Sequence, residues 1–193
     1  MKVAIVKYNA GNIQSVMFAL QRLGIQPIVT NDPELLRQAD KVIFPGVGEA
    51  SSAMKYLKER NLHQVLVQLK QPFLGICLGM QLMCSHSEEN DTECLNIFPL
   101  AVKKFPPKEK VPHTGWNTVY NLGSPILKGI KENEYLYFVH SYYAELGIET
   151  IGTTDYILPF SAALQKDNYF GVQFHPEKSG VAGAKILENF LKF

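Results

Sequence analysis

The first half of the chain alternates short apolar runs with segments of helical periodicity. The apolar runs predict strands, and the intervening segments repeat their apolar positions every three or four residues, as amphipathic helices do. This pattern predicts strands at residues 2–7, 26–30, 41–44 and 73–76, and helices at 12–23, 32–38, part of 50–70, and 78–85. Such alternation is typical of a parallel sheet with helices on both faces.

The second half is richer in strands. Strand-like runs occur near 100–105, 117–120, 135–140, 143–146, 149–153, 160–165 and 169–174, before a last helix at about 179–191. The proline-rich segment 105–112 is short and lies between strand-like runs, so we interpret it as a loop rather than a linker. We therefore predict an α/β fold in one domain, residues 1–193, with a central, mostly parallel sheet flanked by helices and a sheet-rich second half.

The charge balance excludes some classes of partner. Lys and Arg total 19 against 18 Asp and Glu, a net charge of +1, which argues against nucleic-acid or membrane-surface binding. Hydrophobic residues make up 46% of the 193 residues, enough for a sizeable core. The apolar run 3–6 is too short for a signal core or a membrane span. The three cysteines include no C-x-x-C pair, so we expect a cytoplasmic protein without a disulfide or zinc framework.

Cys77 lies where a strand passes into a helix, within Pro72–Met83. Gly75 and Gly79 flank it at minus and plus two, which permits a sharp turn and close approach of neighbouring backbone. The start of a helix favours thiolate over thiol, so this position suits a nucleophile. The alternative is that Cys77 is a small buried hydrophobic residue.

His175 and Glu177 lie at the end of the last predicted strand. A histidine followed two residues later by a carboxylate can form a base with its orienting group. We therefore predict a triad in which Cys77 attacks, His175 transfers protons and Glu177 fixes the imidazole tautomer. A structural histidine beside a surface glutamate is the alternative.

Two of these segments resemble the signatures of a known enzyme family. Gly75-Ile-Cys-Leu-Gly-Met-Gln81 and Phe174-His-Pro-Glu177 look like the motifs of the class I, or triad, glutamine amidotransferases, which release ammonia from glutamine. Within that family, runs along the whole chain resemble the glutaminase subunits of imidazole glycerol phosphate synthases: Asn9–Val16, Phe44–Gly48, Ser87–Glu89, Val111–Asn117, Phe138–Tyr143 and His175–Gly180. The resemblance implies a flavodoxin-like fold and glutamine hydrolysis through a glutamyl thioester.

Substrate-binding residues are expected near the nucleophile. Gln81 lies one helical turn after Cys77, on the same face, so its amide can reach a ligand held at the sulfur. Glu89 is a candidate partner for the α-ammonium group of glutamine, although a solvated charge is the ordinary interpretation. The resemblance favours binding by both residues and by the backbone around Ser141 and Tyr142. The segment after Glu89 lacks the glycines usual in the family, so its path is an open question.

Acyl transfer also requires donors for a tetrahedral oxyanion. The backbone N–H of Leu78, at the helix start, is the first candidate. The second is expected from Val47 or Gly48, because the glycines of Pro45-Gly-Val-Gly48 permit unusual backbone angles. A phosphate-binding loop is the weaker alternative, since the motif is incomplete and Glu49 would repel an anion.

Nothing in the sequence suggests a site that uses the ammonia, so a protein partner is expected. The resemblance implies a heterodimer with a (β/α)8-barrel cyclase, which receives the ammonia and makes imidazole glycerol phosphate in histidine biosynthesis. Positions that match the family's contact surface are Asn12, Pro112, Thr114, Trp116, Asn117 and Lys178. Trp116, the only tryptophan, could equally be a core residue. No cofactor and no metal are expected.

Two departures from the family pattern leave a second function open. Thr114 replaces a methionine that is common there, and Lys7 replaces an acid. These changes suit a paralogous glutaminase that supplies ammonia to another synthase, such as a nucleotide-sugar amidotransferase. A scaffold without activity is disfavoured by the complete triad, and a peptide thiol hydrolase by Gln81 and Glu89, which suit a free amino acid.

Overall fold

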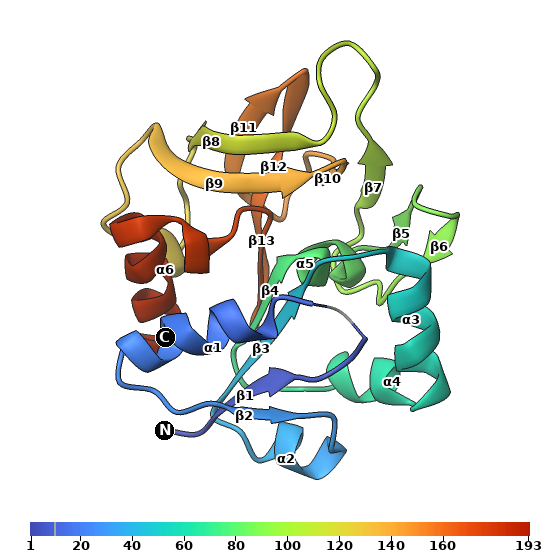
Figure 1. Ribbon diagram of the computed structural model, residues 1–193, viewed down its shortest axis with the longest axis vertical. Coiled ribbons are helices and arrows are strands. Elements are labelled where there is room, and N and C mark those ends of the chain that lie inside the picture. Colours follow the sequence, from blue (N-terminus) through green and yellow to red (C-terminus); the bar gives the residue numbers. More distant parts are fainter. Residues whose placement is uncertain (10) are drawn as a thin grey trace.

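A seven-stranded sheet runs through the molecule in a computed structural model that describes residues 1–9 and 11–193 (Figure 1). The strand order is β11-β12-β13-β4-β3-β1-β2. The strands are β1 (Val3–Val6), β2 (Ile28–Thr30), β3 (Lys41–Gly46), β4 (Phe73–Cys77), β11 (Thr150–Tyr156), β12 (Leu158–Lys166) and β13 (Tyr169–Val172). The strands from β13 to β2 are parallel, and β12 and β11 add an antiparallel pair at one edge. The predicted, mostly parallel sheet is therefore confirmed.

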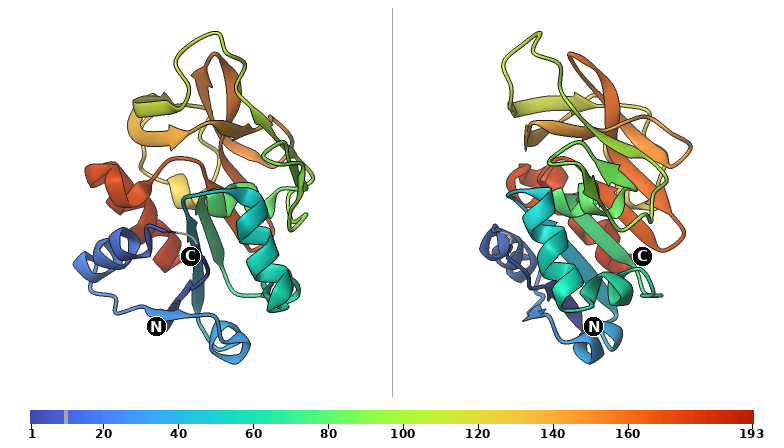
Figure 2. Two further views of the ribbon diagram at one scale, coloured as in Figure 1. Left: turned by 45° about the vertical axis from the view of Figure 1, so that its right-hand side comes forward. Right: turned by 90° about the vertical axis from the view of Figure 1, so that its right-hand side faces the viewer.

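Helices cover both faces of this sheet. They are α1 (Ile13–Arg22), α2 (Pro33–Arg37), α3 (Ala50–Glu59), α4 (Leu62–Leu66), α5 (Leu78–Met83) and α6 (Gly180–Lys192). Figure 2 shows α1 and α6 on the side opposite α3 and α4. Because strand side chains alternate between faces, Val3 and Ile5 pack with α1 and α6, whereas Ala4 and Val6 pack with the other helices.

Two small sheets lie outside the central sheet. One has the order β10-β7-β5-β6, built from β5 (His86–Ser87), β6 (Thr92–Glu93), β7 (Ala101–Lys104) and β10 (Tyr142–Ala144). In the other, β8 (His113–Val119) pairs antiparallel with β9 (Glu134–His140). Short 3₁₀ helices form at η1 (Pro125–Leu127) and η2 (Pro176–Lys178). The segment 105–112 is the predicted loop, between β7 and β8.

Several predicted boundaries were wrong, including three near the site. The strand predicted at 117–120 begins at His113, because β9 pairs with it as far as His140. The strand predicted at 169–174 ends at Val172, and the N–H of His175 donates instead to Tyr137 of β9. The helix predicted at 78–85 ends at Met83. The two-residue strands β5 and β6 are too short to leave a periodic pattern in the sequence.

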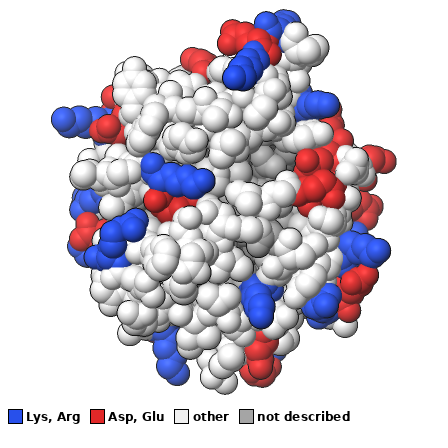
Figure 3. Space-filling view, in the orientation of Figure 1, with Lys and Arg blue, Asp and Glu red and all other residues white. Residues whose placement is uncertain are grey.

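Charged side chains are dispersed over the face seen in Figure 1. Figure 3 shows mainly uncharged residues in the middle of this face, with acidic and basic groups intermixed around its rim. Within residues 1–9 and 11–193, no helix is both long and apolar enough to cross a membrane. Ala10, which belongs to the Asn9–Val16 run, lies outside the described residues.

Candidate active site

Cys77 occupies the turn between β4 and α5. Its backbone angles are φ 54° and ψ −112°, a region that L residues rarely adopt and that persists only where the surroundings enforce it. The residue is buried but lines a pocket. A strained non-glycine residue at a strand-to-helix turn therefore presents its thiol to a cavity.

The two flanking glycines allow the helix to approach the sheet. A Cβ on Gly79 would overlap the carbonyl oxygen of Phe44 in β3. A Cβ on Gly75 would lie 2.8 Å from the backbone nitrogen of Met80 in α5 and would overlap the Met83 sulfur. Both positions thus require glycine because backbone and side chains pack directly against them.

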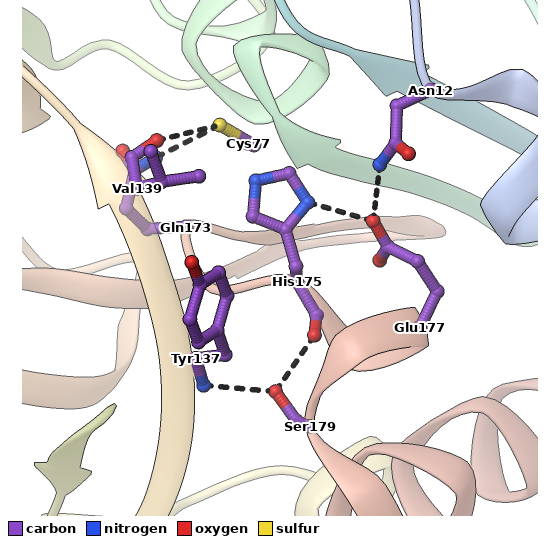
Figure 4. A network of polar contacts seen from close by, with 8 residues as sticks. All are labelled: Asn12, Cys77, Tyr137, Val139, Gln173, His175, Glu177 and Ser179. Carbon is purple, nitrogen blue, oxygen red and sulfur yellow. Dashed lines mark hydrogen bonds and ion pairs between the residues drawn. The ribbon is translucent and has the colours of Figure 1, made fainter. Parts of the chain in front are cut away.

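His175 and Glu177 form a buried ion pair behind the thiol. His175 Nδ1 lies 2.7 Å from Glu177 Oε1, and both side chains are fully buried. The Asn12 side-chain amide donates a hydrogen bond to the same carboxylate oxygen (Figure 4). Glu177 lies on η2 rather than on a strand, because Pro176 has no N–H with which to continue the ladder.

The second imidazole nitrogen of His175 is directed at the thiol. Nε2 faces Cys77 in Figure 4 and has no hydrogen-bond partner among the described residues. Burial lowers the pKa of His175, but the adjacent Cys77 sulfur and the Glu177 carboxylate more than offset this and raise the pKa above its usual 6.5. The arrangement therefore favours the imidazolium form of His175.

A cavity of about 290 Å³ opens in front of Cys77, at the small end of the range for ligand pockets. It brings together every residue predicted for the oxyanion and the substrate, although these come from different parts of the chain. Its lining comprises Val47, Gly48, Cys77, Leu78, Gln81, Glu89, Pro112, Val139, His140, Ser141 and Tyr142. His175 and Glu177 are not part of the lining, because they lie behind the sulfur.

The candidate oxyanion donors lie beside the thiol because β3 and β4 end together. Gly46 pairs with Cys77 in the sheet register, so Val47 and Gly48 continue past the nucleophile. Gly48 has φ 124°, a conformation open to glycine. Leu78 is the first residue of α5, where a backbone N–H has no partner within the helix.

Glu49 makes an anion site at this loop unfavourable. Its carboxylate accepts hydrogen bonds from the N–H groups of Ser51 and Ser52 and so caps α3. Hydrogen bonding, chiefly with Ser51, lowers the pKa of Glu49 to about 2 even though burial opposes the shift. The negative charge on the helix N-terminus argues against the phosphate-binding alternative.

Gln81 has a fixed orientation in the pocket. Its Nε2 donates to the Tyr142 carbonyl at 2.8 Å and to Gln173 Oε1 at 2.9 Å. Both amide hydrogens are thereby used, so Oε1 is the atom left to interact with a ligand. Gln81 therefore suits a ligand that donates a hydrogen bond.

Glu89 supplies a partly desolvated carboxylate at the edge of the pocket. Oε2 accepts a hydrogen bond from the N–H of Ala50 at 2.8 Å. Burial raises the pKa of Glu89, the Ala50 hydrogen bond opposes the shift and the charge of Glu49 adds to it. A cationic ligand group nearby would stabilise the ionised form of this carboxylate.

The glycine-free segment after Glu89 forms a tight connection between β5 and β6. Asn90 and Asp91 adopt φ values of 54° and 49°. Asn and Asp tolerate this left-handed region better than other non-glycine residues. The Asn90 side chain also donates to Glu49 at 2.8 Å, so Asn90 and Asp91 fill the turn positions for which glycine was expected.

The residues predicted to contact a partner protein differ in their solvent exposure. Thr114, Trp116 and Lys178 are exposed. Trp116 is 55% exposed and packs edge-on against Tyr137, over whose ring the Lys178 ammonium lies at 5.9 Å from the centroid; the core alternative for Trp116 is therefore wrong. Pro112 is exposed at the pocket rim.

Asn12 and Asn117, by contrast, are half-buried. Asn12 contacts Glu177, as described above, and Asn117 Nδ2 lies 3.2 Å from His113 Nε2 and 3.0 Å from the Asp155 carbonyl. Their side-chain amides thus form hydrogen bonds within the chain.

Two buried histidines near the pocket were missed in the sequence. His113 Nδ1 lies 3.0 Å from His140 Nε2, and His140 Nδ1 lies 2.8 Å from the Tyr142 carbonyl. Burial lowers the pKa of His113 to about 4 and, with smaller contributions from neighbours, that of His140 to about 3. Both imidazoles are therefore neutral near pH 7. Their only signal was their place inside the Val111–Asn117 and Phe138–Tyr143 runs.

Comparison with known proteins identifies the family of the chain. The family described as "Glutamine amidotransferase class-I" matches residues 5–193. "Imidazole glycerol phosphate synthase subunit HisH" of Bacteroides fragilis is 58% identical over 195 residues, and that of Blochmanniella floridana is 48% identical, each with 100% of both chains covered. The crystal structure of a putative GMP synthase protein from Thermoplasma acidophilum has a TM-score of 0.77 at 19% identity, covering 100% of this chain and 92% of that one, which shows the same fold.

Proposed function

The chain belongs to the class-I glutamine amidotransferases, and we propose that it is the glutaminase subunit of an imidazole glycerol phosphate synthase. The observation that carries the proposal is the arrangement of the Cys77 thiol, the His175 imidazole and the Glu177 carboxylate one after another, beside a pocket of amino-acid size. Relatives that bear the synthase name match the chain over its whole length at up to 58% identity. None of the relatives reported above bears the name of a nucleotide-sugar enzyme, so the paralogue alternative has no comparable support.

Glutamine binding follows from the polar groups of the pocket. The Glu89 carboxylate and the Gln81 Oε1 atom both attract the α-ammonium group, and backbone groups of Ser141 and Tyr142 bind the amino-acid end. The side-chain amide then extends toward Cys77. This placement brings the amide carbon to the sulfur and its oxygen to the N–H groups of Leu78 and of Val47 or Gly48.

The first half of the reaction forms a thioester. The Cys77 thiolate attacks the amide carbon, and the carbonyl electrons move onto oxygen. His175 then gives its Nε2 proton to the amide nitrogen, the carbon–nitrogen bond breaks and ammonia leaves. Glu177, fixed by the Asn12 amide, stabilises the imidazolium before this transfer.

The second half returns the enzyme to its starting state. His175, now neutral, takes a proton from water, which attacks the thioester carbon. The carbon–sulfur bond breaks, its electron pair returns to sulfur and glutamate is released. The sulfur is a thiolate again beside an imidazolium, the state that the raised pKa of His175 favours.

The ammonia requires an acceptor on another chain. The proposed partner is a (β/α)8-barrel cyclase, docked on the face that carries Thr114, Trp116 and Lys178. Trp116 and the Lys178–Tyr137 pair provide an exposed aromatic and cationic surface on β8, β9 and η2, the composition typical of interface anchors. Asn12 and Asn117 would act from beneath this surface.

Cys77→Ala separates glutamine hydrolysis from the use of ammonia. In the complex with the cyclase, we expect the variant to lose glutamine-dependent product formation by at least ~10⁴-fold. Ammonium salt should still support product formation, because the synthase site lies on the partner. Cys94→Ala is the matched control, since Cys94 is a free thiol away from the pocket. Full glutamine-dependent synthesis by Cys77→Ala would exclude the proposed nucleophile.

A further inference from the structure

Gln173 is a buried polar residue beside the nucleophile that the mechanism above does not use. It is fully buried, and its N–H donates to the Ala162 carbonyl at 2.8 Å, which fixes the base of the side chain to the sheet. Its Nε2 lies 3.6 Å from the Cys77 sulfur (Figure 4). A fully buried amide is costly unless its hydrogen bonds are satisfied, so this contact with sulfur needs explanation.

The orientation of the Gln173 amide follows from a backbone carbonyl. The Tyr142 carbonyl can only accept, so Gln81 must present its NH₂ group there. The same NH₂ group reaches Gln173, which must therefore present its oxygen to Gln81. That leaves the NH₂ group of Gln173 facing Cys77.

The sulfur lies between groups that prefer different protonation states. The Val139 carbonyl, 3.8 Å from the sulfur, can accept a hydrogen bond only from the thiol. The Gln173 NH₂ group can donate to sulfur, and such a bond strengthens when sulfur carries negative charge. Gln173 therefore acts in the same direction as the His175 imidazolium, from a different side of the sulfur (Figure 4).

We propose that Gln173 is a further catalytic residue, which donates an N–H hydrogen bond to the Cys77 thiolate. The proposal rests on the thiol chemistry proposed above. The bond stabilises the resting thiolate, and it forms again when the thioester carbon–sulfur bond breaks and the electron pair returns to sulfur. Because Gln81 holds the other end of the amide, the residue that binds substrate also aligns the donor at the nucleophile.

The test measures the pH dependence of Cys77 alkylation by iodoacetamide in the isolated chain, with the site identified by mass spectrometry. Leu at position 173 keeps the approximate volume and removes the donor. In Gln173→Leu, we expect the midpoint of the alkylation profile to rise by about one pH unit, as for the loss of a hydrogen bond to a charged group. At pH values above both midpoints, alkylation should be at least as fast as in the wild type, because an unbonded thiolate is the stronger nucleophile.

Two further variants separate this role from a structural one. Gln173→Glu keeps the size and, when ionised, presents oxygen to sulfur, so its midpoint should rise at least as far. Thr154→Val removes another fully buried donor from the same sheet, whose hydroxyl bonds the Thr118 carbonyl at 3.0 Å. This control should lower stability without moving the Cys77 midpoint.

A midpoint unchanged in both Gln173 variants would overturn the proposal. A midpoint that moved equally in Thr154→Val would also overturn it, because the shift would then reflect loosened packing. Glutamine hydrolysis by the wild-type complex is measured alongside. Its absence would refute the proposed function, whereas the alkylation midpoints report on Gln173 without glutamine or partner.

Discussion

Gly79→Ala tests whether the turn at Cys77 depends on direct packing of backbone against backbone. An added Cβ would overlap the Phe44 carbonyl oxygen and lie 2.9 Å from its carbonyl carbon, compared with ~3.5 Å for an ordinary contact. Phe44 cannot move easily, because it is fully buried and its ring packs 5.0 Å from Tyr8 and 5.9 Å from Phe73 between centroids. The substitution must therefore force α5 and β3 apart.

Two opposing effects determine how much Gly79→Ala changes the free energy of unfolding. Alanine is favoured over glycine in a helix by about 1 kcal/mol. Overpacking costs about 1–3 kcal/mol, and the upper end applies because backbone must move. We expect a net loss of about 2 kcal/mol in the free energy of unfolding, which lowers the melting temperature of a domain of this size by about 4–8 °C.

The measurement is urea and thermal unfolding followed by circular dichroism. Gly123→Ala is the matched control, because Gly123 is exposed and an added Cβ there meets no atom within 4 Å. The control should stay within about 0.5 kcal/mol of the wild type. A Gly79→Ala chain as stable as the wild type, or more stable, would show that helix propensity outweighs the contact and would refute the packing argument.

Two further predictions concern the other cysteines and the buried histidines. A glutamine-mimicking electrophile should label Cys77 and spare Cys84 and Cys94. Burial raises the pKa of Cys84 and is the main cause that raises the pKa of Cys94 from 9.0 to about 12, so the Cys94 thiolate is about 10³-fold less populated than that of a thiol with the ordinary pKa. Equal labelling of all three cysteines in peptide mass spectra would contradict the activated nucleophile. Because the pKa of His140 falls from 6.5 to about 3 on folding, the unfolded chain binds the extra proton as pH falls below 6.5, and folding should lose about 2 kcal/mol at pH 5 from this residue. In urea unfolding at pH 7.5 and pH 5, His140→Asn should therefore lose less stability between the two pH values than the wild type; equal losses in His140→Asn and wild type would exclude the assignment.

Much of the fold and the triad could be predicted from the sequence, because their signals are local. The unbroken apolar run Val3–Val6 records a strand that is buried on both faces by helices. Gly75 and Gly79 around Cys77 mark a turn whose geometry depends on the lack of side chains within a few residues. His175 and Glu177 are two residues apart, so their ion pair is also a local feature.

Other residues of the site could not be assigned from the sequence, because their partners are distant. Asn12 contacts Glu177 across 165 positions, and Gln173 contacts Cys77 across 96. Gln173 precedes His175 by two positions, as strand neighbours on one side do, but an amide at that spacing is also common in ordinary strands. The orientation of the Gln81 and Gln173 amides depends on the Tyr142 carbonyl, a backbone group with no side-chain signature. Spacing along the chain thus determined the elements and the candidate nucleophile, whereas only the tertiary structure decided which buried donors reach the sulfur, because a hydrogen bond depends on distance and direction in space.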